Sequence, residues 1–364
     1  TDAQQKQPKH VMMMAAGTGG HVFPALAVAK DLEQQGIKVS WLATPAGMEN
    51  RLLKNHNIPI YQIDIQGVRG NGVVRKLAAP FKILKATFSA MKYMRQLKVD
   101  AVAGFGGYVA GPGGLAARML GIPVIIHEQN AVAGFTNTQL SRIAKKVCQA
   151  FPNTFSAQDK IVTTGNPVRK EITEIFNPSW RYQEREKAGQ PLRILIVGGS
   201  LGAQALNECV PEALKQLNVP LNVYHQCGQN HADATRARYA DAPATLNVEV
   251  QPFIEDMAQA YSDADLIICR AGALTVTEIA TAGVAAIFVP LPSAVDDHQT
   301  ANARFLANLG AAKICPQATM TPDSLKALLE PMLNRQLLME MAVKARQQAQ
   351  PDATQHVVRL IQEL

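Results

Sequence analysis

Two distant stretches of this sequence share one pattern: an apolar strand, a glycine-rich turn and the start of a helix. They are MMMAAGTGGH at 12–21 and ILIVGGSLGA at 194–203. After each, short apolar runs bounded by Gly, Pro or Asp alternate with helix-length segments, as in parallel sheets covered by helices on both faces. The expected strands are VSWLAT, DAVAGFGG, PVIIHEQ, RILIVGGS, NVYHQ, DLIICRAG and AAIFVPL. The repetition predicts an α/β fold of two doubly wound, Rossmann-like domains.

The length of the chain agrees with two domains. Its 364 residues suffice for two hydrophobic cores of ordinary size. We place the first domain at 1–165 and the second at 166–350, joined near GNPVR. The segment 351–364 is expected to form a helix that returns to the first domain.

The glycine-rich turns predict where ligands bind. In doubly wound folds, ligands lie beyond the carboxyl ends of the strands, where a helix N-terminus attracts anions. Neither turn completes a GxGxxG motif, and the strand after the first turn ends in Ala43-Thr44 with no acidic residue, which counts against NAD binding. The sequence has no GxxxxGK[ST] motif, so a P-loop is excluded. We therefore expect two half-sites that face each other across a cleft.

Other site classes find less support in the sequence. The five cysteines are widely spaced and form no CxxC pair, which argues against disulfides or zinc and favours a reducing compartment. No run of 18 apolar residues predicts a membrane span. Asp263-Ala-Asp265 has the form of a DxD metal motif, but acids at this point also mark a helix end and a strand start. Asp296-Asp297-His298 is interpreted as a polar loop. No metal site is predicted.

The charge of the chain is divided unequally. Residues 1–165 hold 19 Lys and Arg against 8 Asp and Glu, and residues 166–364 hold 17 against 21. The first half thus has a net charge of +11 and the second of −4, which indicates an anionic partner for the first domain. No nucleic-acid-binding module is present, and aromatic residues make up only 5% of the chain. We expect an anionic membrane surface and no nucleic acid.

One predicted helix combines apolar residues at helical spacing with flanking basic residues. It lies in RKLAAPFKILKATFSAMKYMR, where Met91 continues the apolar stripe. Such a pattern most often belongs to a helix that faces the core and carries solvated lysines. The alternative is an amphipathic helix that lies on a membrane surface. The expected membrane contacts are Arg75, Lys76, Leu77, Phe81, Lys82, Leu84, Lys85, Phe88, Arg142, Lys145 and Lys146.

Seven motifs in order carry a resemblance to a known family. They are GTGGHVFPALAVA, GFGGYVAGPGGLAA, HEQNAVAGFTN, GNPVR, VGGSLGA, RAGALTVTE and DDHQTANA. Together they resemble the MurG family over nearly the whole chain, although Ala16 stands where the family often has glycine. The resemblance implies a GT-B glycosyltransferase that inverts the anomeric centre and moves N-acetylglucosamine from UDP to the 4-hydroxyl of lipid I, giving lipid II. It implies no cofactor, a peripheral position on the cytoplasmic face of the inner membrane, and partners among the cell-wall synthesis proteins.

The resemblance assigns the donor site to the second domain. There Glu278 would bind the ribose of UDP and Ser200 would bind phosphate. The backbone of Ile254 would bind uracil. Arg169 and Gln299 would also contact the donor. The amides of RAGALTVTE would bind the diphosphate at a helix N-terminus. Thr275-x-x-Glu278 is also a capping-box pattern, so Glu278 could merely cap its own helix. The full donor segment comprises Ala273, Leu274, Thr275, Val276, Thr277 and Glu278.

The first turn is expected to serve the acceptor. Transfer needs a base to take the proton of the attacking hydroxyl, and His21 is our candidate, against the alternative of a histidine satisfied by nearby backbone. Glu128 is the second candidate, as base or as the group that orients His21. Asn130 is expected to hydrogen-bond a substrate sugar, unless it only holds a turn. Donor binding is assigned to Thr18, Gly19, Gly20 and Asn130, and the three residues of the turn are also assigned to the acceptor diphosphate.

Two other functions stay open on the sequence alone. A UDP-N-acetylglucosamine 2-epimerase would have the same twin-domain architecture and would act on the donor without a lipid acceptor. An inactive module that binds nucleotide sugar or membrane would tolerate replacement of His21.

Overall fold

The computed structural model describes residues 6–65, 72–199, 201–292 and 297–364. The chain forms two compact units. Unit 1 comprises residues up to Val168 together with Gln350–Leu364, and unit 2 comprises Arg169–Ala349. The predicted boundary after residue 165 thus lies three residues before the division between the units.

Unit 1 contains a parallel sheet of seven strands in the order β3-β2-β1-β4-β5-β6-β7. The strands are β1 (His10–Ala15), β2 (Lys38–Ala43), β3 (Ile60–Gln62), β4 (Ala101–Gly106), β5 (Val124–Glu128), β6 (Lys146–Gln149) and β7 (Ile161–Thr163). Its helices are α1 (Gly19–Gln34), α2 (Glu49–Leu52), α3 (Val73–Leu97), α4 (Ala110–Met119), α5 (Phe135–Leu140) and α15 (Ala353–Gln362).

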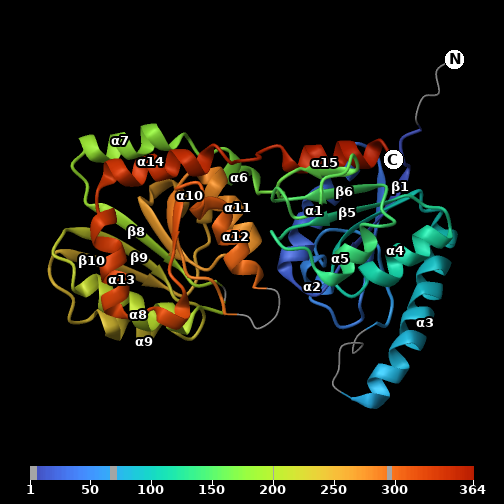
Figure 1. The fold of residues 1–364 in the computed structure, drawn as a ribbon, viewed down its shortest axis with the longest axis horizontal. Helices are drawn as coiled ribbons and strands as arrows, with labels where there is room; N and C mark the ends of the chain where they lie inside the picture. The colour runs from blue at the N-terminus through green and yellow to red at the C-terminus, as the bar shows by residue number, and fades with distance from the viewer. Residues whose placement is uncertain (1–5, 66–71, 200, 293–296) are drawn as a thin grey trace. The chain divides into compact units, whose positions relative to one another are not determined.

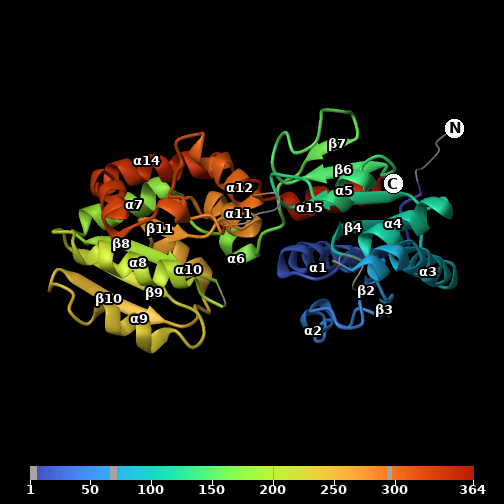
Figure 2. The ribbon, with the colours of Figure 1, turned by 60° about the horizontal axis from the view of Figure 1, so that its bottom comes forward.

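Strand β1 explains why the VMMMA run is apolar without alternation. Met13 packs with α1 and α15 on one face of the sheet, whereas Met12 and Met14 pack with α3, α4 and α5 on the other. Successive side chains of a strand point to opposite faces, so a strand covered on both faces must be apolar throughout. Helix α15 lies beside α1 (Figures 1 and 2) and contributes Val357 and Ile361 to the same core.

Unit 2 contains a parallel sheet of six strands in the order β10-β9-β8-β11-β12-β13. The strands are β8 (Leu192–Val197), β9 (Leu221–Gln226), β10 (Leu246–Gln251), β11 (Leu266–Cys269), β12 (Ala285–Phe288) and β13 (Ala312–Ile314). Its helices are α6 (Lys170–Thr173), α7 (Pro178–Lys187), α8 (Gln204–Lys215), α9 (Ala232–Tyr239), α10 (Met257–Asp263), α11 (Ala273–Ala282), α12 (His298–Ala307), α13 (Pro322–Leu329) and α14 (Arg335–Arg346). The predicted α/β fold class is confirmed in both units.

In each unit the central strand leads into a glycine-rich turn and a helix. Strand β1 leads into α1, and β8 leads into α8. On one side of this central strand lies the next strand in sequence, and on the other side lies a strand from later in the chain. Strand β1 lies between β2 and β4, and β8 lies between β9 and β11. A reversal of strand order of this kind leaves a crevice at the carboxyl ends of the strands. His21 follows the end of β1, Glu128 ends β5 and the RAGALTVTE segment follows β11.

Candidate active site

His21 lies in the first turn of α1 and is held by the turn that precedes this helix. Its Nδ1 lies 3.1 Å from the carbonyl oxygen of Ala16. Because a carbonyl oxygen can only accept, Nδ1 carries the proton of the neutral ring and Nε2 presents its lone pair. The left-handed φ of the turn falls on Gly17 (+91°) and not on Ala16, so alanine is tolerated at position 16 without backbone strain.

The imidazole of His21 lies against the end of β4. A β-carbon built on Gly106 would lie 2.8 Å from both Cδ2 and Nε2 of His21. The backbone at Gly106 also has a φ of +117°, a conformation that is practically restricted to glycine. Ala16 N donates to the Gly106 carbonyl at 3.2 Å, so the two loops that surround the ring are joined. GFGG thus supplies the surface on which His21 rests.

The first turn of α1 presents backbone amides at the positive end of a 16-residue helix. Thr18 is the N-cap, its side chain makes no capping hydrogen bond, and the turn contains no acidic residue. His21 N and Val22 N both donate to the Thr18 carbonyl at 3.1 Å. The amides of Gly19 and Gly20 stand at the helix end, where an anion is favoured. This geometry suits the predicted phosphate contact, which stays a prediction.

Glu128 ends β5 and organises the loop that follows it. Its carboxylate accepts hydrogen bonds from Gly134 N at 2.8 Å, Asn130 N at 3.2 Å and Asn137 Nδ2 at 3.3 Å. The group that orients Nδ1 of His21 is the Ala16 carbonyl, a role suggested above for Glu128. Asn130, half-buried, has its backbone fixed by the same carboxylate. Catalytic or sugar-binding roles for these two residues stay predictions.

Sequence reasoning passed over His127, which lies buried directly before Glu128. Its Nε2 donates to the Gly165 carbonyl at 3.0 Å, and its Nδ1 accepts from Gln129 Nε2 at 3.1 Å. Burial lowers the pKa of His127 to about 4, so the ring is neutral near pH 7. A polar residue at the end of an apolar strand was the available signal. Through these two hydrogen bonds, His127 connects the HEQN segment to the GNP segment.

In unit 2, the structure shows that Glu278 does not form a capping box with Thr275. Helix α11 begins at Ala273 with Gly272 as its N-cap, so Thr275 is already inside the helix. Glu278 instead forms an ion pair with Arg169 at 3.0 Å and a hydrogen bond with the buried hydroxyl of Tyr261. Burial raises the pKa of Glu278, and Arg169 opposes that shift. Tyr261 is a further member of this group that the sequence did not reveal.

The other predicted residues of α11 have unequal access. Ala273, Leu274 and Thr275 form the first turn, where backbone amides stand at the positive end of the helix. Val276 is fully buried, so only its backbone can serve a ligand. The Thr277 hydroxyl donates to the Ala273 carbonyl at 2.9 Å.

The second glycine-rich turn is held by Gln226, at the end of β9. The Gln226 side-chain oxygen accepts from Gly198 N at 3.0 Å and from Gly199 N at 3.1 Å. Its amide group donates to the carbonyls of Gly199 at 2.7 Å and Pro252 at 2.9 Å. Ser200, predicted to bind phosphate, lies outside the described residues. Gln226 therefore shapes the turn on which this prediction depends, and NVYHQ held no signal for it beyond a buried polar residue.

Gln299 and Ile254 lie at loops beyond the carboxyl ends of the strands. The Gln299 side-chain oxygen accepts from Ala271 N at 3.1 Å and from Leu291 N at 2.8 Å, which ties the loop after β11 to the loop after β12. Ile254 is buried and lines a groove beside α10 of about 370 Å³. Gln299 thus has a structural role in this state, and its predicted donor contact stays untested.

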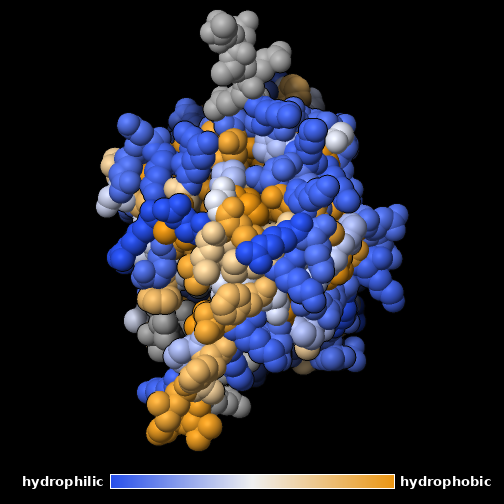
Figure 3. Space-filling model, turned by 90° about the vertical axis from the view of Figure 1, so that its right-hand side faces the viewer, coloured by the Kyte–Doolittle hydropathy of each residue, from blue (hydrophilic) through white to orange (hydrophobic). Residues whose placement is uncertain are grey.

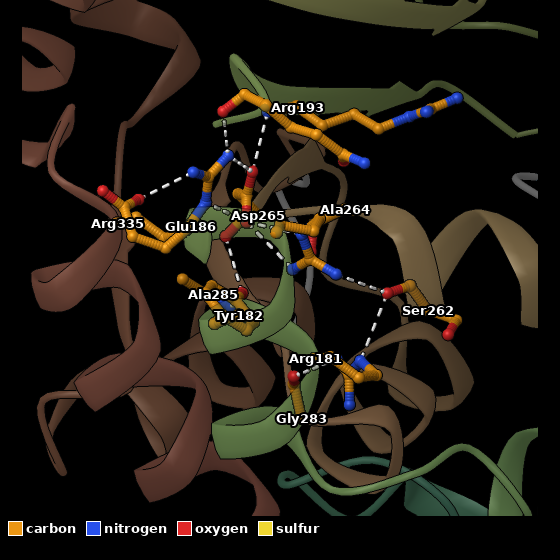
Figure 4. Close-up of polar contacts among 12 residues, drawn as sticks. Arg181, Tyr182, Glu186, Arg193, Ser262, Ala264, Asp265, Gly283, Ala285 and Arg335 are labelled. Atoms are coloured by element: carbon orange, nitrogen blue, oxygen red, sulfur yellow. Dashed lines mark hydrogen bonds and ion pairs between the residues drawn. The ribbon is translucent and has the colours of Figure 1, made fainter. Parts of the chain in front are cut away.

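The Asp263-Ala-Asp265 motif does not form a metal site around Asp265. The Asp265 carboxylate is fully buried at the start of β11, where Arg185 lies at 2.9 Å and Arg335 at 3.2 Å. Figure 4 shows the polar contacts around Asp265 and Arg335. Arg193 N also donates to it at 2.9 Å. Within the described ranges, no group of three His, Cys, Asp or Glu is arranged to hold a metal ion. Asp296 of the DDH segment lies outside the described residues.

Helix α3 exposes the apolar residues that we predicted for a membrane surface. Phe81 is 75% exposed and Leu77 69%, and apolar side chains gather over the first part of the helix in Figure 3. The core-facing alternative is therefore wrong for Leu77, Phe81, Leu84 and Phe88, which are exposed, and holds for Met91, which is buried. The side chain of Arg75 lies outside the described part of the chain. No helix among the described residues is long and apolar enough to cross a bilayer.

The basic residues outside α3 that we predicted for membrane contact lie just before β6 and at its first residue. Arg142 and Lys145 are exposed and Lys146 is half-buried. Lys145 Nζ donates to the Leu364 carbonyl at 3.0 Å, so this lysine also contacts the end of the last helical segment. Their contact with a membrane stays a prediction.

Comparison with known proteins relates both units to glycosyltransferases. Residues 11–149 match the glycosyltransferase family 28 N-terminal domain, and residues 193–357 match the glycosyltransferase family 28 C-terminal domain. The chain is 80% identical, over the full length of both chains, to the UDP-N-acetylglucosamine–N-acetylmuramyl-(pentapeptide) pyrophosphoryl-undecaprenol N-acetylglucosamine transferase of Acinetobacter baumannii strain AYE. The transferase of the same name from Psychrobacter cryohalolentis is 52% identical, covering 97% of this chain and 98% of its own.

Solved structures give the same relationship. The crystal structure of Acinetobacter baumannii MurG superposes with a TM-score of 0.90 at 77% identity, covering 98% of this chain and 100% of its own. A UDP-GlcNAc 2-epimerase from Neisseria meningitidis superposes with a TM-score of 0.62 at 13% identity, covering 96% and 98%. This second likeness shows a shared fold alone.

Proposed function

The chain belongs to glycosyltransferase family 28, in its MurG group, and we infer that it transfers N-acetylglucosamine from UDP-N-acetylglucosamine to lipid I. The products are lipid II and UDP. One observation supports the chemistry most directly: the ring of His21 is fixed with Nδ1 on the Ala16 carbonyl at 3.1 Å, which leaves Nε2 to accept a proton at a helix N-terminus.

In the proposed reaction, Nε2 of His21 takes the proton of the acceptor 4-hydroxyl as its oxygen attacks the anomeric carbon of the donor. The bond between this carbon and the UDP oxygen breaks on the opposite side, so the configuration inverts. The amides of Gly19 and Gly20, at the N-terminus of α1, would hold the acceptor diphosphate through helix-end hydrogen bonds.

The donor is assigned to unit 2. The carboxylate of Glu278 would accept hydrogen bonds from the ribose hydroxyls, with Arg169 and Tyr261 holding it in place through the contacts that they already make. The first-turn amides of α11 would face the diphosphate and stabilise the charge that grows as UDP departs. The Ile254 backbone is proposed to bind uracil, and Gln299 is proposed to contact the donor.

Membrane association is proposed for the first half of α3. Its exposed side chains Leu77, Phe81, Leu84 and Phe88 would enter the headgroup region, and Lys76, Lys82 and Lys85 would contact anionic lipids. The enzyme would then lie on the cytoplasmic face of the membrane that carries its lipid acceptor.

The test is transfer of labelled N-acetylglucosamine from UDP to a short-chain lipid I analogue, with a chelator present. We expect product from the wild type and about a hundredfold to ten-thousandfold less from His21→Ala, the usual contribution of a general base. Donor turnover without acceptor, or unchanged activity of His21→Ala, would contradict the transferase or the base assignment respectively.

A further inference from the structure

A buried carboxylate outside the predicted site lies next to the turn that holds His21. Glu49 begins α2 and is 0% exposed. Its Oε1 accepts from Thr44 N and Thr44 Oγ1, both at 2.8 Å, and its Oε2 accepts from Gly17 N at 3.2 Å. Buried carboxylates are rare unless their oxygens are satisfied. Here the donors come from two loops at the ends of neighbouring strands, β1 and β2.

The Gly17 N–H and the Ala16 carbonyl belong to one peptide group. Its N–H donates to Glu49 Oε2 at 3.2 Å, and its oxygen accepts from His21 Nδ1 at 3.1 Å. In a trans peptide these two groups point in opposite directions and lie in one plane. Glu49 and His21 therefore hold the same plane from opposite sides, and the direction of one hydrogen bond determines the direction of the other.

The link between the two side chains is electronic as well as geometric. A carboxylate that accepts from a peptide N–H polarises that peptide and makes its carbonyl a better acceptor, because hydrogen bonds in a chain strengthen one another. A stronger acceptor at Ala16 favours the His21 tautomer with the proton on Nδ1. Carboxylates and carbonyls that bind the second nitrogen of a histidine fix its tautomer in the same manner.

The loop after β2 packs closely around the Glu49 carboxylate. A β-carbon on Gly47 would lie 2.1 Å from both carboxylate oxygens of Glu49, so the carboxylate rests on bare backbone. The neighbouring Asn50 fastens the same loop by donating to the carbonyls of Thr44 at 2.7 Å and Gly47 at 3.1 Å. Asn50 thus holds the loop after β2 through its backbone and does not hold the Ala16–Gly17 peptide, which makes it a matched comparison for Glu49.

We propose that Glu49 is a positioning residue for His21, acting through the Ala16–Gly17 peptide to hold the imidazole in the Nδ1–H tautomer with Nε2 free to take a proton. The proposal rests on His21 being the base of the transfer reaction. It predicts that Glu49 affects the chemical step and not donor binding.

The first experiment measures transfer kinetics of the full chain for the wild type, Glu49→Gln and Asn50→Ala. A glutamine side chain has only one oxygen to accept from Gly17 and Thr44, which lie on two different loops. Its NH₂ group would face one of these donors and could not accept a hydrogen bond from it. We expect Glu49→Gln to lower kcat by about tenfold to a hundredfold, as loss of an orienting partner does, with the KM for UDP-N-acetylglucosamine within about twofold of the wild type. Asn50→Ala should keep kcat within about twofold. Equal losses of kcat in both variants would overturn the proposal.

A double-mutant cycle separates action through His21 from general damage. If Glu49 acts through the imidazole, Glu49→Gln should cause no further loss of kcat in a His21→Ala background. An equal loss of kcat in both backgrounds would show that Glu49 acts by another route.

The His21 tautomer can be measured directly in the wild type. This measurement does not depend on whether the variants fold. In ¹⁵N-histidine spectra we expect the neutral ring of His21 to be protonated on Nδ1, and Glu49→Asp or Glu49→Gln to populate the Nε2–H form. A wild-type ring protonated on Nε2 would overturn the proposal even if transfer is observed. Absence of wild-type transfer would instead contradict the proposed function, and the spectra would still decide the tautomer.

Discussion

The imidazole of His21 packs against the backbone of Gly106 so closely that a β-carbon at position 106 would lie 2.8 Å from Nε2. The atom proposed to take the proton is thus the one that a side chain at this position would displace. The contact joins the turn after β1 to the end of β4, two strands that neighbour each other in the sheet.

Gly106→Ala should therefore lower kcat about a hundredfold, since a displacement of about 1 Å at the reacting group has that effect. Binding of UDP to unit 2 should be unchanged. The matched control is Gly121→Ala, because Gly121 also has a left-handed φ (+71°) but a β-carbon added there would meet no atom within 4 Å. Gly121→Ala should lose about 1–2 kcal/mol of stability. Gly106→Ala should lose more, because its φ of +117° is practically restricted to glycine, and only Gly106→Ala should lose activity. Wild-type kcat in Gly106→Ala would show that the ring position is unimportant.

Glu278→Gln should raise the KM for UDP-N-acetylglucosamine by about tenfold to a hundredfold, the usual effect of losing a hydrogen bond to a charged group. Isothermal titration with UDP at several pH values checks the protonation state. Burial raises the pKa of Glu278. As the pH is lowered, the carboxylate should therefore become protonated, and the affinity for UDP should begin to fall, at a pH above the ordinary titration range of a glutamate.

Tyr261→Phe is the companion variant for this titration. The Tyr261 hydrogen bond lowers the pKa of Glu278, so its removal should move the loss of UDP affinity to higher pH. A loss of affinity that follows the same pH curve in wild type, Glu278→Gln and Tyr261→Phe would exclude Glu278 as the titrating group.

Asp265→Asn should destabilise unit 2 by about 3–5 kcal/mol, because it breaks a buried pair, leaves Arg185 without its charge partner and leaves Arg335 with the Glu186 carboxylate alone. Urea unfolding measures this loss. Asp263→Asn is the control, since Asp263 accepts from the exposed Gln259 side chain at 2.8 Å and its replacement should have little effect. A DxD metal site would give another pattern: both variants would lose transfer activity and neither would be selectively unstable.

Acid should destabilise the folded chain through its buried histidines. Burial lowers the pKa of His127 and His225 from 6.5 to about 4, so as pH falls below 6.5 the unfolded chain binds protons before the folded chain does. Stability is complete above pH 6.5 and declines towards pH 4, by about 2 kcal/mol per histidine at pH 5. Urea unfolding at pH 7 and pH 5 should show a smaller decline in stability for His225→Gln than for the wild type. Identical declines in the two proteins would refute the assignment.

Phe81→Ser combined with Phe88→Ser should weaken binding to anionic phospholipid vesicles by about a hundredfold or more, since each exposed phenylalanine contributes about 1.5–3 kcal/mol when it leaves water. Lys82→Gln combined with Lys85→Gln should weaken it about thirtyfold, at about 1 kcal/mol for each charge. Transfer to a water-soluble acceptor should be retained in both. Phe176→Ser, which replaces an exposed phenylalanine of unit 2, should leave vesicle binding unchanged; an equal loss there would show that α3 is not the contact surface.

The sequence by itself determined the fold class, the two glycine-rich turns and the family, because these depend on local features. Apolar runs with helix-length spacing predict a parallel sheet, and left-handed backbone requires glycine at Gly17 and Gly106 wherever the rest of the chain lies. Ordered motifs also placed His21 at a helix start and Glu278 in the helix that follows Gly272. Each of these inferences uses the order of residues along the chain and no contact between distant segments.

The tertiary structure decided which partner each polar side chain has. Glu278 is paired with Arg169, 109 residues away, and Asp265 with Arg335, 70 residues away, so the actual partners of these two carboxylates could not be identified from the residues around them. Glu49 accepts from Gly17, 32 residues earlier, with no signal in the residues around it. A buried charge takes whichever donors the folded sheet brings to its strand end, and that proximity exists only after the strands have paired.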